Sequence, residues 1–211
     1  MLFSKEQLDN LSASIKARLS DERYSHTIGV LQAAKRIGEY FVGIDLSELA
    51  AAALLHDVAK EIDEETQVAL LEASDIELSE SDINSPPIFH ALSAPYVIKN
   101  EFSDFVTENI LSAVKNHTTG CERMSVFDEI IMISDYVEMG RTHESCVGVR
   151  NELFEALMNA ANEKECITAL HKAVYNSLVL TEKHIIKRGR HFNERSSLAK
   201  KYFHELLNLQ C

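Results

Sequence analysis

An apolar stretch of the sequence, AALLHDVAK (residues 52–60), carries the adjacent pair His56 and Asp57 in its middle. A stretch this apolar predicts a buried helix. A buried imidazole beside a buried carboxylate is costly unless a partner compensates both groups, and a metal ion is the simplest such partner. We therefore expect a fold that brings further ligands from other parts of the chain to this pair.

Composition predicts that this fold consists of helices. The chain has 211 residues, 45% of them hydrophobic, but only 7 Gly and 3 Pro. Because β-branched runs with strict alternation are also few, the expected class is all-α, a helical bundle with a C-terminal helical extension. Residues 1–211 are expected to form a single domain, with a core at about 20–145 and C-terminal helices at about 147–211.

Local signals place the individual helices. Ser4 and Gln7 have the spacing of a capping box and begin a first helix. Further helices are expected from about Asp21 and over 49–59, 63–73, 86–102, 103–116, 125–140, 147–186 and 194–209. Residues 74–85 are polar and acidic and predict a loop. Pro95 predicts a kink or a break in the helix that contains it.

Charge and cysteine usage limit the class of partner. The formal net charge of −12 does not favour a broad nucleic-acid or anionic-membrane surface, although a local metal site can still attract a small phosphorylated substrate. Four cysteines without a C-x-x-C pair indicate reduced thiols, and neither a secretory signal nor a membrane span is visible. We expect a cytoplasmic protein that acts on a small molecule, without nucleic-acid or membrane partners, and that could form a homodimer.

Candidate metal ligands occur in five widely separated segments. They are His26, His56, Asp57, His90, His117 and Asp135. Imidazole suits Fe, Zn, Mn, Co or Ni, and carboxylate also suits Mg. Six ligands are too many for one tetrahedral ion and suit two ions that share Asp57, an arrangement that recurs in the hydrolysis of phosphate esters and anhydrides. A lone buried histidine is more often a hydrogen-bonded core residue, so the prediction depends on the complete set.

These segments also carry a resemblance to a known family. The ordered pattern His26, His56-Asp57, Asp135 is similar to that of the HD-domain metal phosphohydrolases. Together with PPIFHA (86–91), NHTTG (116–120) and ISDYVEMGR (133–141), the sequence over about 20–150 resembles the YqeK subfamily of symmetrical bis(5'-nucleosyl)-tetraphosphatases. Ser134 and Met139 depart from the family pattern, which has Ala and Pro there, and this puts local helix packing in question more than the chemistry.

The resemblance implies an all-helical HD fold and two metal ions, of which iron is the first candidate. It also implies that a hydroxide activated by the two metals cleaves diadenosine tetraphosphate into two ADP molecules. One ion would be held by His26, His56, Asp57 and Asp135. The other would be held by Asp57, His90 and His117, with Asp57 as the bridge.

Several nearby residues are candidates for contact with the substrate. Lys60 follows Asp57 by three positions and is expected to share its helix face, so Asp57 and Lys60 are the catalytic candidates. Thr118 and Thr119 could donate hydroxyls to phosphate, and Arg23 and Arg141 could offer bidentate guanidinium groups. The alternatives are a solvated lysine, ordinary helix capping by the threonines, and pairing of Arg141 with Glu138.

Two other functions remain open from the sequence. The same metal ligands would serve another HD-type phosphohydrolase, either a nucleotidase or a hydrolase of alarmone nucleotides. A nucleotide-binding regulator without turnover is a third possibility, and a missing ligand would be its signature. All six candidate positions are present, which favours an enzyme.

Overall fold

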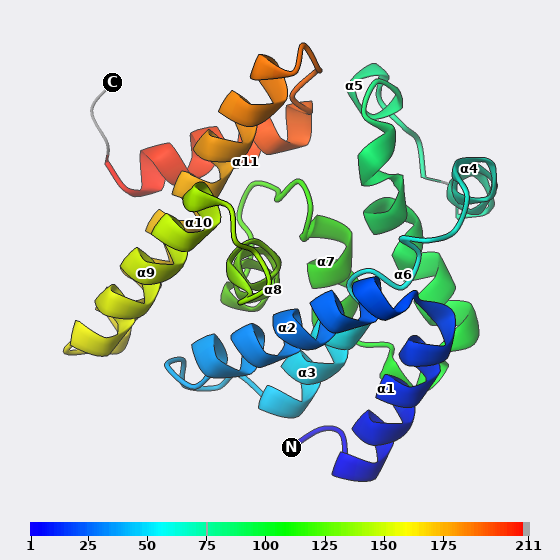
Figure 1. The fold of residues 1–211 in the computed structure, drawn as a ribbon, viewed down its shortest axis with the longest axis horizontal. Coiled ribbons are helices and arrows are strands. Elements are labelled where there is room, and N and C mark those ends of the chain that lie inside the picture. Colours follow the sequence, from blue (N-terminus) through cyan, green and yellow to red (C-terminus); the bar gives the residue numbers. More distant parts are fainter. Residues whose placement is uncertain (75, 209–211) are drawn as a thin grey trace.

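The fold is known from a computed structural model, which describes residues 1–74 and 76–208 (Figure 1). These residues form helices and contain no strand, in agreement with the predicted all-α class. The α-helices are α1 (Lys5–Arg18), α2 (Asp21–Gly38), α3 (Leu46–Leu55), α4 (Glu64–Ala73), α5 (Glu80–Ile83), α6 (Phe89–Glu101), α7 (Glu108–Asn116), α8 (Val126–Val137), α9 (Glu144–Asn159), α10 (Glu163–Lys187) and α11 (Glu194–Leu206). Two short 3₁₀ helices are η1 (Pro86–Ile88) and η2 (Ser103–Phe105).

Polar N-caps explain where many of these helices begin. The Ser4 hydroxyl accepts from the backbone N–H of Gln7, and the backbone N–H of Ser4 donates to the Gln7 side chain, which confirms the predicted capping box of α1. Asp45 caps α3 by accepting from two backbone N–H groups. Ser125 and Asp128 form a second capping box at the start of α8. These caps fix the starts of α1, α3 and α8.

The helix that carries the His-Asp pair is shorter than predicted. It was expected to continue to residue 59, but α3 ends at Leu55 and the chain then turns tightly. The Nδ1 atom of His56 lies 2.8 Å from the carbonyl oxygen of Ala53. In a continuing α-helix that carbonyl would accept from the N–H of Asp57. The imidazole therefore takes the place of the next helical hydrogen bond, and His56 and Asp57 lie at the end of the helix.

Other boundaries also differ from the expectations. The predicted loop at 74–85 contains the short helix α5, and the helix expected from residue 103 is divided into η2 and α7, which Thr107 caps. Of the two outcomes expected at Pro95, the break does not occur, because α6 continues on both sides of it. Residue 209 of the last predicted helix and Cys211 lie outside the described residues.

The buried helix α3 lies at the centre of the packing. Residues 49–55 are all buried, and α1, α2, α7 and α8 all contact this helix. α8 also contacts α9 and α10, so it lies between the N-terminal helices and the C-terminal layer of α9, α10 and α11 (Figure 1). The run of four alanines in α3 has only methyl side chains, so the neighbouring helices can approach α3 closely.

A buried ion pair joins the C-terminal layer to α5. Asp82 is fully buried and accepts from Nε and Nη2 of Arg195 at 3.0 Å each, and from the side-chain amide of Asn193 at 3.1 Å. Burial favours the neutral acid, but the hydrogen bonds from Arg195 and Asn193 outweigh it and lower the pKa of Asp82 to about 2. This cluster holds the start of α11 against α5, which face each other in Figure 1.

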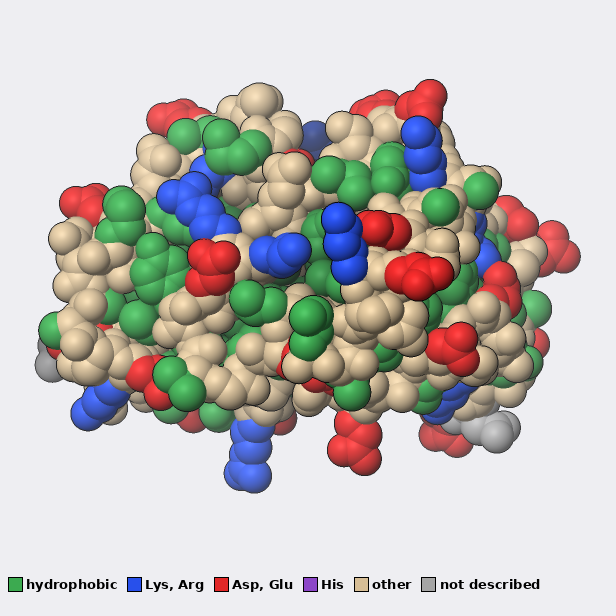
Figure 2. Space-filling view, turned by 90° about the horizontal axis from the view of Figure 1, so that it is seen from below, with side chains coloured by type: hydrophobic (Ala, Val, Ile, Leu, Met, Phe, Trp, Pro, Cys, Tyr) green, Lys and Arg blue, Asp and Glu red, His purple; other side chains and the backbone are tan. Residues whose placement is uncertain are grey.

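The surface carries both signs of charge. On the face shown in Figure 2, acidic and basic side chains are interspersed, and no histidine side chain is visible among its described residues. Within the described part of the chain, no helix has both the length and the apolar composition needed to cross a membrane.

The Asp82 cluster predicts a specific pH dependence of stability. Since the pKa of Asp82 is lower in the folded protein than its usual value near 3.8, the ionised group stabilises the fold above about pH 4, and this contribution is lost as the pH falls towards 2. We expect Asp82→Asn to lower the free energy of unfolding by about 1 kcal/mol at pH 7, a figure reduced because Arg195 is partly exposed. The difference from the native protein, measured by urea unfolding, should shrink between pH 4 and pH 2.

The matched control is Asp9→Asn, which neutralises an exposed carboxylate on α1. It should leave stability at pH 7 within the usual range for surface substitutions, about 0.5 kcal/mol. A difference between Asp82→Asn and native protein that stayed constant from pH 7 to pH 2 would contradict the assignment.

Candidate metal centre

The six candidate ligands come together from five helices. His26 lies within α2, the His56-Asp57 pair follows α3, His90 is in the first turn of α6, His117 follows α7 and Asp135 is in α8. The side chains of His56, Asp57, His90 and His117 are at most 4% exposed. Two groups of three have ligand atoms that all lie within 4.8 Å of one another: His26, His56 and Asp135, and His56, Asp57 and His117.

A repeated backbone contact orients three of the four histidines. In each, the ring Nδ1 lies within hydrogen-bond distance of the carbonyl oxygen three residues earlier. The pairs are His56 with Ala53 at 2.8 Å, His90 with Pro87 at 2.8 Å, and His117 with Val114 at 2.7 Å. A carbonyl can only accept, so Nδ1 carries the proton and Nε2 keeps a free lone pair. This is the arrangement typical of metal-ligating histidines.

The carboxylate of Asp57 faces two pairs of histidines with its two oxygen atoms. Oδ1 lies 3.2 Å from Nε2 of His90 and 3.6 Å from Nε2 of His117. Oδ2 lies 3.5 Å from Nε2 of His56 and 4.0 Å from Nε2 of His26. The carboxylate thus stands between two groups of nitrogen donors, as a carboxylate shared by two cations must.

Unsatisfied donor atoms indicate that the cluster lacks a binding partner of its own. Nε2 of His26 and Nε2 of His56 are buried and form no hydrogen bond, although a carboxylate oxygen lies 3.0 Å from the first and 3.5 Å from the second. Buried nitrogen atoms without a partner are rare in native proteins. Nitrogen and carboxylate donors in this number suit divalent metal ions, so the donor set fits such ions.

The two carboxylates of the cluster are ionised and favour positive charge beside them. Burial opposes ionisation, but the surrounding histidines outweigh it and hold the pKa of Asp57 well below its usual range. At Asp135, His26 and Arg141 outweigh burial in the same way. Burial alone would lower the pKa of His56, yet Asp57 and Asp135 together raise it. A divalent cation can provide this positive charge in place of a proton.

At His90, on the other side of Asp57, the balance favours the neutral imidazole. Burial, together with the neighbouring Lys60 and His117, lowers the pKa of His90 to about 4. Burial also lowers the pKa of Lys60, although Asp57 acts in the opposite direction. A neutral imidazole is the form that binds a metal.

Cationic and hydroxyl side chains surround the cluster. Arg23 Nη1 lies 3.0 Å from Asp57 Oδ2, and Lys60 Nζ lies 3.2 Å from Nε2 of His90. Thr118 Oγ1 lies 3.0 Å from Nε2 of His117. Three of the predicted substrate-contacting side chains, Arg23, Lys60 and Thr118, are therefore adjacent to the candidate ligands.

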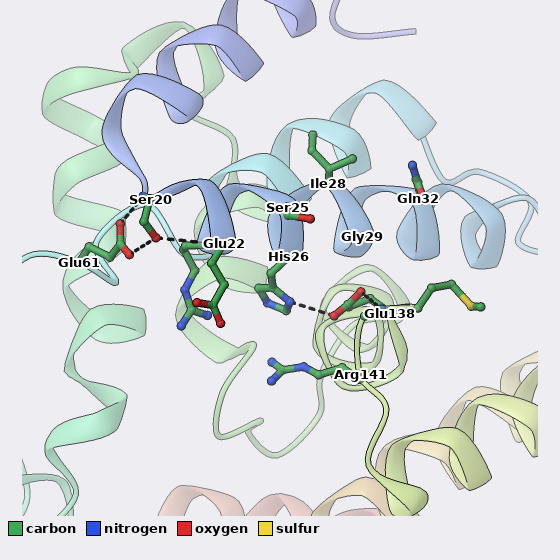
Figure 3. Close-up of a pocket in the computed structure, with 13 residues that line it drawn as sticks. Ser20, Glu22, Ser25, His26, Ile28, Gly29, Gln32, Glu61, Glu138 and Arg141 are labelled. Carbon is green, nitrogen blue, oxygen red and sulfur yellow. Dashed lines mark hydrogen bonds and ion pairs between the residues drawn. The ribbon is translucent and has the colours of Figure 1, made fainter.

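The two remaining candidates differ in orientation. Arg141 Nη2 lies 2.7 Å from Asp135 Oδ1, so its ion pair is with a candidate ligand and not with Glu138, the alternative partner suggested by spacing. Thr119 is buried and donates its hydroxyl to the carbonyl oxygen of Gly120, so it does not point at the metal ligands. Figure 3 shows His26 and Arg141 extending into the same space.

Glu138 has a role that sequence reasoning missed. Its Oε1 lies 3.2 Å from Nδ1 of His26 (Figure 3). Glu138 thus contacts Nδ1 of the fourth histidine, as backbone carbonyls contact Nδ1 of the other three. Gly140 donates its backbone N–H to Oε2, and any Cβ at Gly29 would collide with the Glu138 carboxylate. The signal in the sequence was the acidic residue three positions after Asp135, but only the fold shows that it reaches α2.

Removal of the Glu138 charge should weaken metal binding. Glu138→Gln keeps the shape but removes the negative charge that orients and polarises His26. Partners of this kind are worth about 10- to 100-fold in metal affinity, so we expect a loss of that size in metal titration of the protein. Glu22→Gln, an exposed residue that lines the same cavity, is the control and should bind metal like the native protein. Equal affinities in both variants would exclude this role of Glu138.

Comparison with known proteins agrees with this geometry. The family model described as HD domain matches residues 23–140, a range that contains all six candidate ligands. The chain is 30% identical over 178 residues to a protein of Halalkalibacterium halodurans named bis(5'-nucleosyl)-tetraphosphatase, symmetrical, covering 83% of this chain and 86% of that one. It is 32% identical over 149 residues to a Bacillus subtilis protein of the same name, with coverages of 71% and 78%.

A solved structure has the same overall fold. The crystal structure of a "predicted HD superfamily hydrolase involved in NAD metabolism" from Clostridium acetobutylicum superposes with a TM-score of 0.81 at 27% sequence identity. The match covers 94% of this chain and 97% of the other. Family model, relatives and fold agree: the chain belongs to the HD-domain family of hydrolases, in the same group as the proteins named symmetrical bis(5'-nucleosyl)-tetraphosphatases.

Proposed function

We propose that this protein hydrolyses diadenosine tetraphosphate symmetrically, to two ADP molecules, at a centre of two metal ions. The position of the Asp57 carboxylate between two pairs of histidine Nε2 atoms is the observation that carries the proposal. The substrate is inferred from the names of the relatives in Halalkalibacterium halodurans and Bacillus subtilis. Iron is the first candidate for the metal, with Mn, Co, Ni, Zn and Mg as alternatives.

Each oxygen atom of the Asp57 carboxylate belongs to one of the two proposed ligand sets. His26, His56, Asp57 and Asp135 would hold one ion, and Asp57, His90 and His117 would hold the other. When bound, such a pair supplies acidification of a water molecule and neutralisation of phosphate charge. The anchored Nδ1 atoms keep the Nε2 donors directed at the centre, so the protein contributes a donor arrangement that is fixed before any ion binds.

The side chains around the centre suit a polyphosphate. Arg23 and Arg141 line a cavity of about 700 Å³ next to His26. They are 31% and 42% exposed, so their guanidinium groups can reach a ligand in that cavity as well as the carboxylates with which they pair. Lys60 adds a partly buried cation on the His90 side, where it would stabilise negative charge that develops on the phosphate being cleaved. Thr118 offers a hydroxyl donor beside His90 and His117.

Product identification tests the proposed cleavage. Metal-loaded protein incubated with diadenosine tetraphosphate should yield ADP as the sole nucleotide product, as measured by anion-exchange chromatography. Cleavage at any other phosphoanhydride would give unequal products, so ATP together with AMP would reject the symmetrical scheme. Substrate that remains intact while nucleoside monophosphates are dephosphorylated would favour the alternative nucleotidase.

Replacement of Asp57 tests the shared carboxylate. Asp57→Asn keeps the size of the side chain but removes the charge that would be common to both ions. We expect kcat to fall at least about 100-fold, because a fixed charge at the reaction centre is worth this much or more. Elemental analysis should show the loss of both ions, whereas Asp104→Asn, an exposed residue in η2, should keep native metal content and rate. Active native protein with well under two ions per chain would contradict the dinuclear scheme.

A further inference from the structure

A second cavity lies on the other side of the centre and is not used by the metal ligands. Its volume is about 550 Å³, within the range of small-molecule sites. It lies between η1, the turn after α7, the C-terminal end of α10 and the segment that leads into α11. Thr118 lines this cavity and also contacts His117 and His90, so the cavity opens beside the candidate metal centre.

The walls of this cavity suit a flat apolar ring. Five side chains provide apolar surface: Pro86, Pro87, Ile88, Ile185 and Phe192. Phe192 is 9% exposed and precedes Asn193, the N-cap of α11. Aromatic and apolar side chains are the usual surfaces on which proteins stack nucleobases, and this chain has no Trp for that purpose.

One buried hydroxyl in the cavity wall has no partner. Ser85 is 7% exposed, and its Oγ atom is buried without a hydrogen bond. The neighbouring buried polar groups differ, because Thr119 donates to a carbonyl and Asn193 bonds to Asp82. A buried hydroxyl left without a partner is destabilising, so its presence in a cavity wall points to a polar group of a ligand.

The cavity on the His26 side has a different character. Its lining includes Arg23 and Arg141 but no Phe or Tyr among the described residues (Figure 3). It can neutralise phosphate, but among its described lining residues the only aromatic ring is the imidazole of His26, a candidate metal ligand. Of the two cavities that the described residues form beside the candidate ligands, the one on the Thr118 side therefore offers a nucleoside a phenyl ring and more apolar surface.

We propose that the cavity bounded by Ser85, Phe192 and Thr118 binds one nucleoside of the substrate. The base packs against Phe192, the Ser85 hydroxyl bonds to a polar atom of the nucleoside, and the phosphate chain passes Thr118 towards the metal ligands. The assignment rests on the proposed function in that the ligand class is a nucleoside polyphosphate. It gives the C-terminal helices a part in substrate binding that the sequence did not reveal.

The Asp82 cluster supports this arrangement physically. Arg195 and Asn193 bond to Asp82, and Glu194 donates its backbone N–H to Ser81. These bonds hold Asn193, which follows Phe192, against Asp82 of α5. Asp82 in turn lies three positions before Ser85. The two sides of the cavity are therefore fixed relative to each other, which reduces the entropy lost when a ligand binds.

Binding measurements on the metal-loaded protein test the nucleoside site. The probes are ADP, which carries a nucleoside, and inorganic pyrophosphate, which does not. We expect Phe192→Ala to weaken ADP binding about ten-fold and Ser85→Ala to weaken it about five-fold, with pyrophosphate affinity unchanged in both. Isothermal titration calorimetry gives each constant, and circular dichroism checks that the variants fold; Ser85→Ala removes a single atom and covers the case that Phe192→Ala does not fold.

Two controls match these substitutions. Phe105→Ala removes a phenyl ring of similar exposure from a different cavity, and Ser177→Ala removes a buried hydroxyl that bonds within α10. Both should bind ADP like the native protein. Unchanged ADP affinity in the cavity variants, or equal losses for ADP and pyrophosphate, would overturn the proposal.

The outcomes separate this inference from the proposed function. Native protein that binds ADP through Phe192 and Ser85 but does not cleave diadenosine tetraphosphate would support the nucleoside site and refute the reaction. Symmetrical cleavage with a KM that neither variant changes would support the reaction and refute the site. Native protein that shows no preference for ADP over pyrophosphate would refute the site as well.

Discussion

The structure depends on one buried carboxylate that is surrounded by four imidazoles. Asp57 lies at the end of the most buried helix, and its two oxygen atoms face different pairs of histidines. Neither the charge nor the nitrogen lone pairs could remain there without compensation, because the surroundings exclude water. The burial of its apolar residues places α3 at the centre, and four other helices bring the surrounding groups to its C-terminal end.

The type of fold and the identity of the clustered residues were accessible from the sequence. Helical periodicity and the low Gly and Pro content predict helices, and the apolar surroundings of His56 and Asp57 predict a buried polar centre. Both depend on local composition, which a sequence states directly. The clustering of His26, His90, His117 and Asp135 was predicted because all four are metal-ligand residue types that occur in the ordered pattern of a known family.

What the sequence could not supply depends on contacts between distant segments. Glu138 was considered only as a neighbour of Arg141, and its contact with His26 exists because α2 and α8 pack closely at Gly29. Likewise, α3 ends at Leu55 because the His56 side chain competes with the N–H of Asp57 for the carbonyl of Ala53. Helical periodicity in the sequence does not predict such a contact. The cavity at Phe192 depends on the contact between α5 and α11, two elements more than a hundred residues apart.

The anchored Nδ1 atoms have a consequence for how the centre is loaded. Because three imidazoles are tied to carbonyls of their own turn, their orientation is set by local backbone formation. These rings lose their rotational entropy when the protein folds. Metal binding therefore carries little further entropy cost from ordering them. A receptor preorganised in this way responds to ion size and coordination preference through its fixed donor spacing, and discrimination among metals becomes a property of the polypeptide's rigidity.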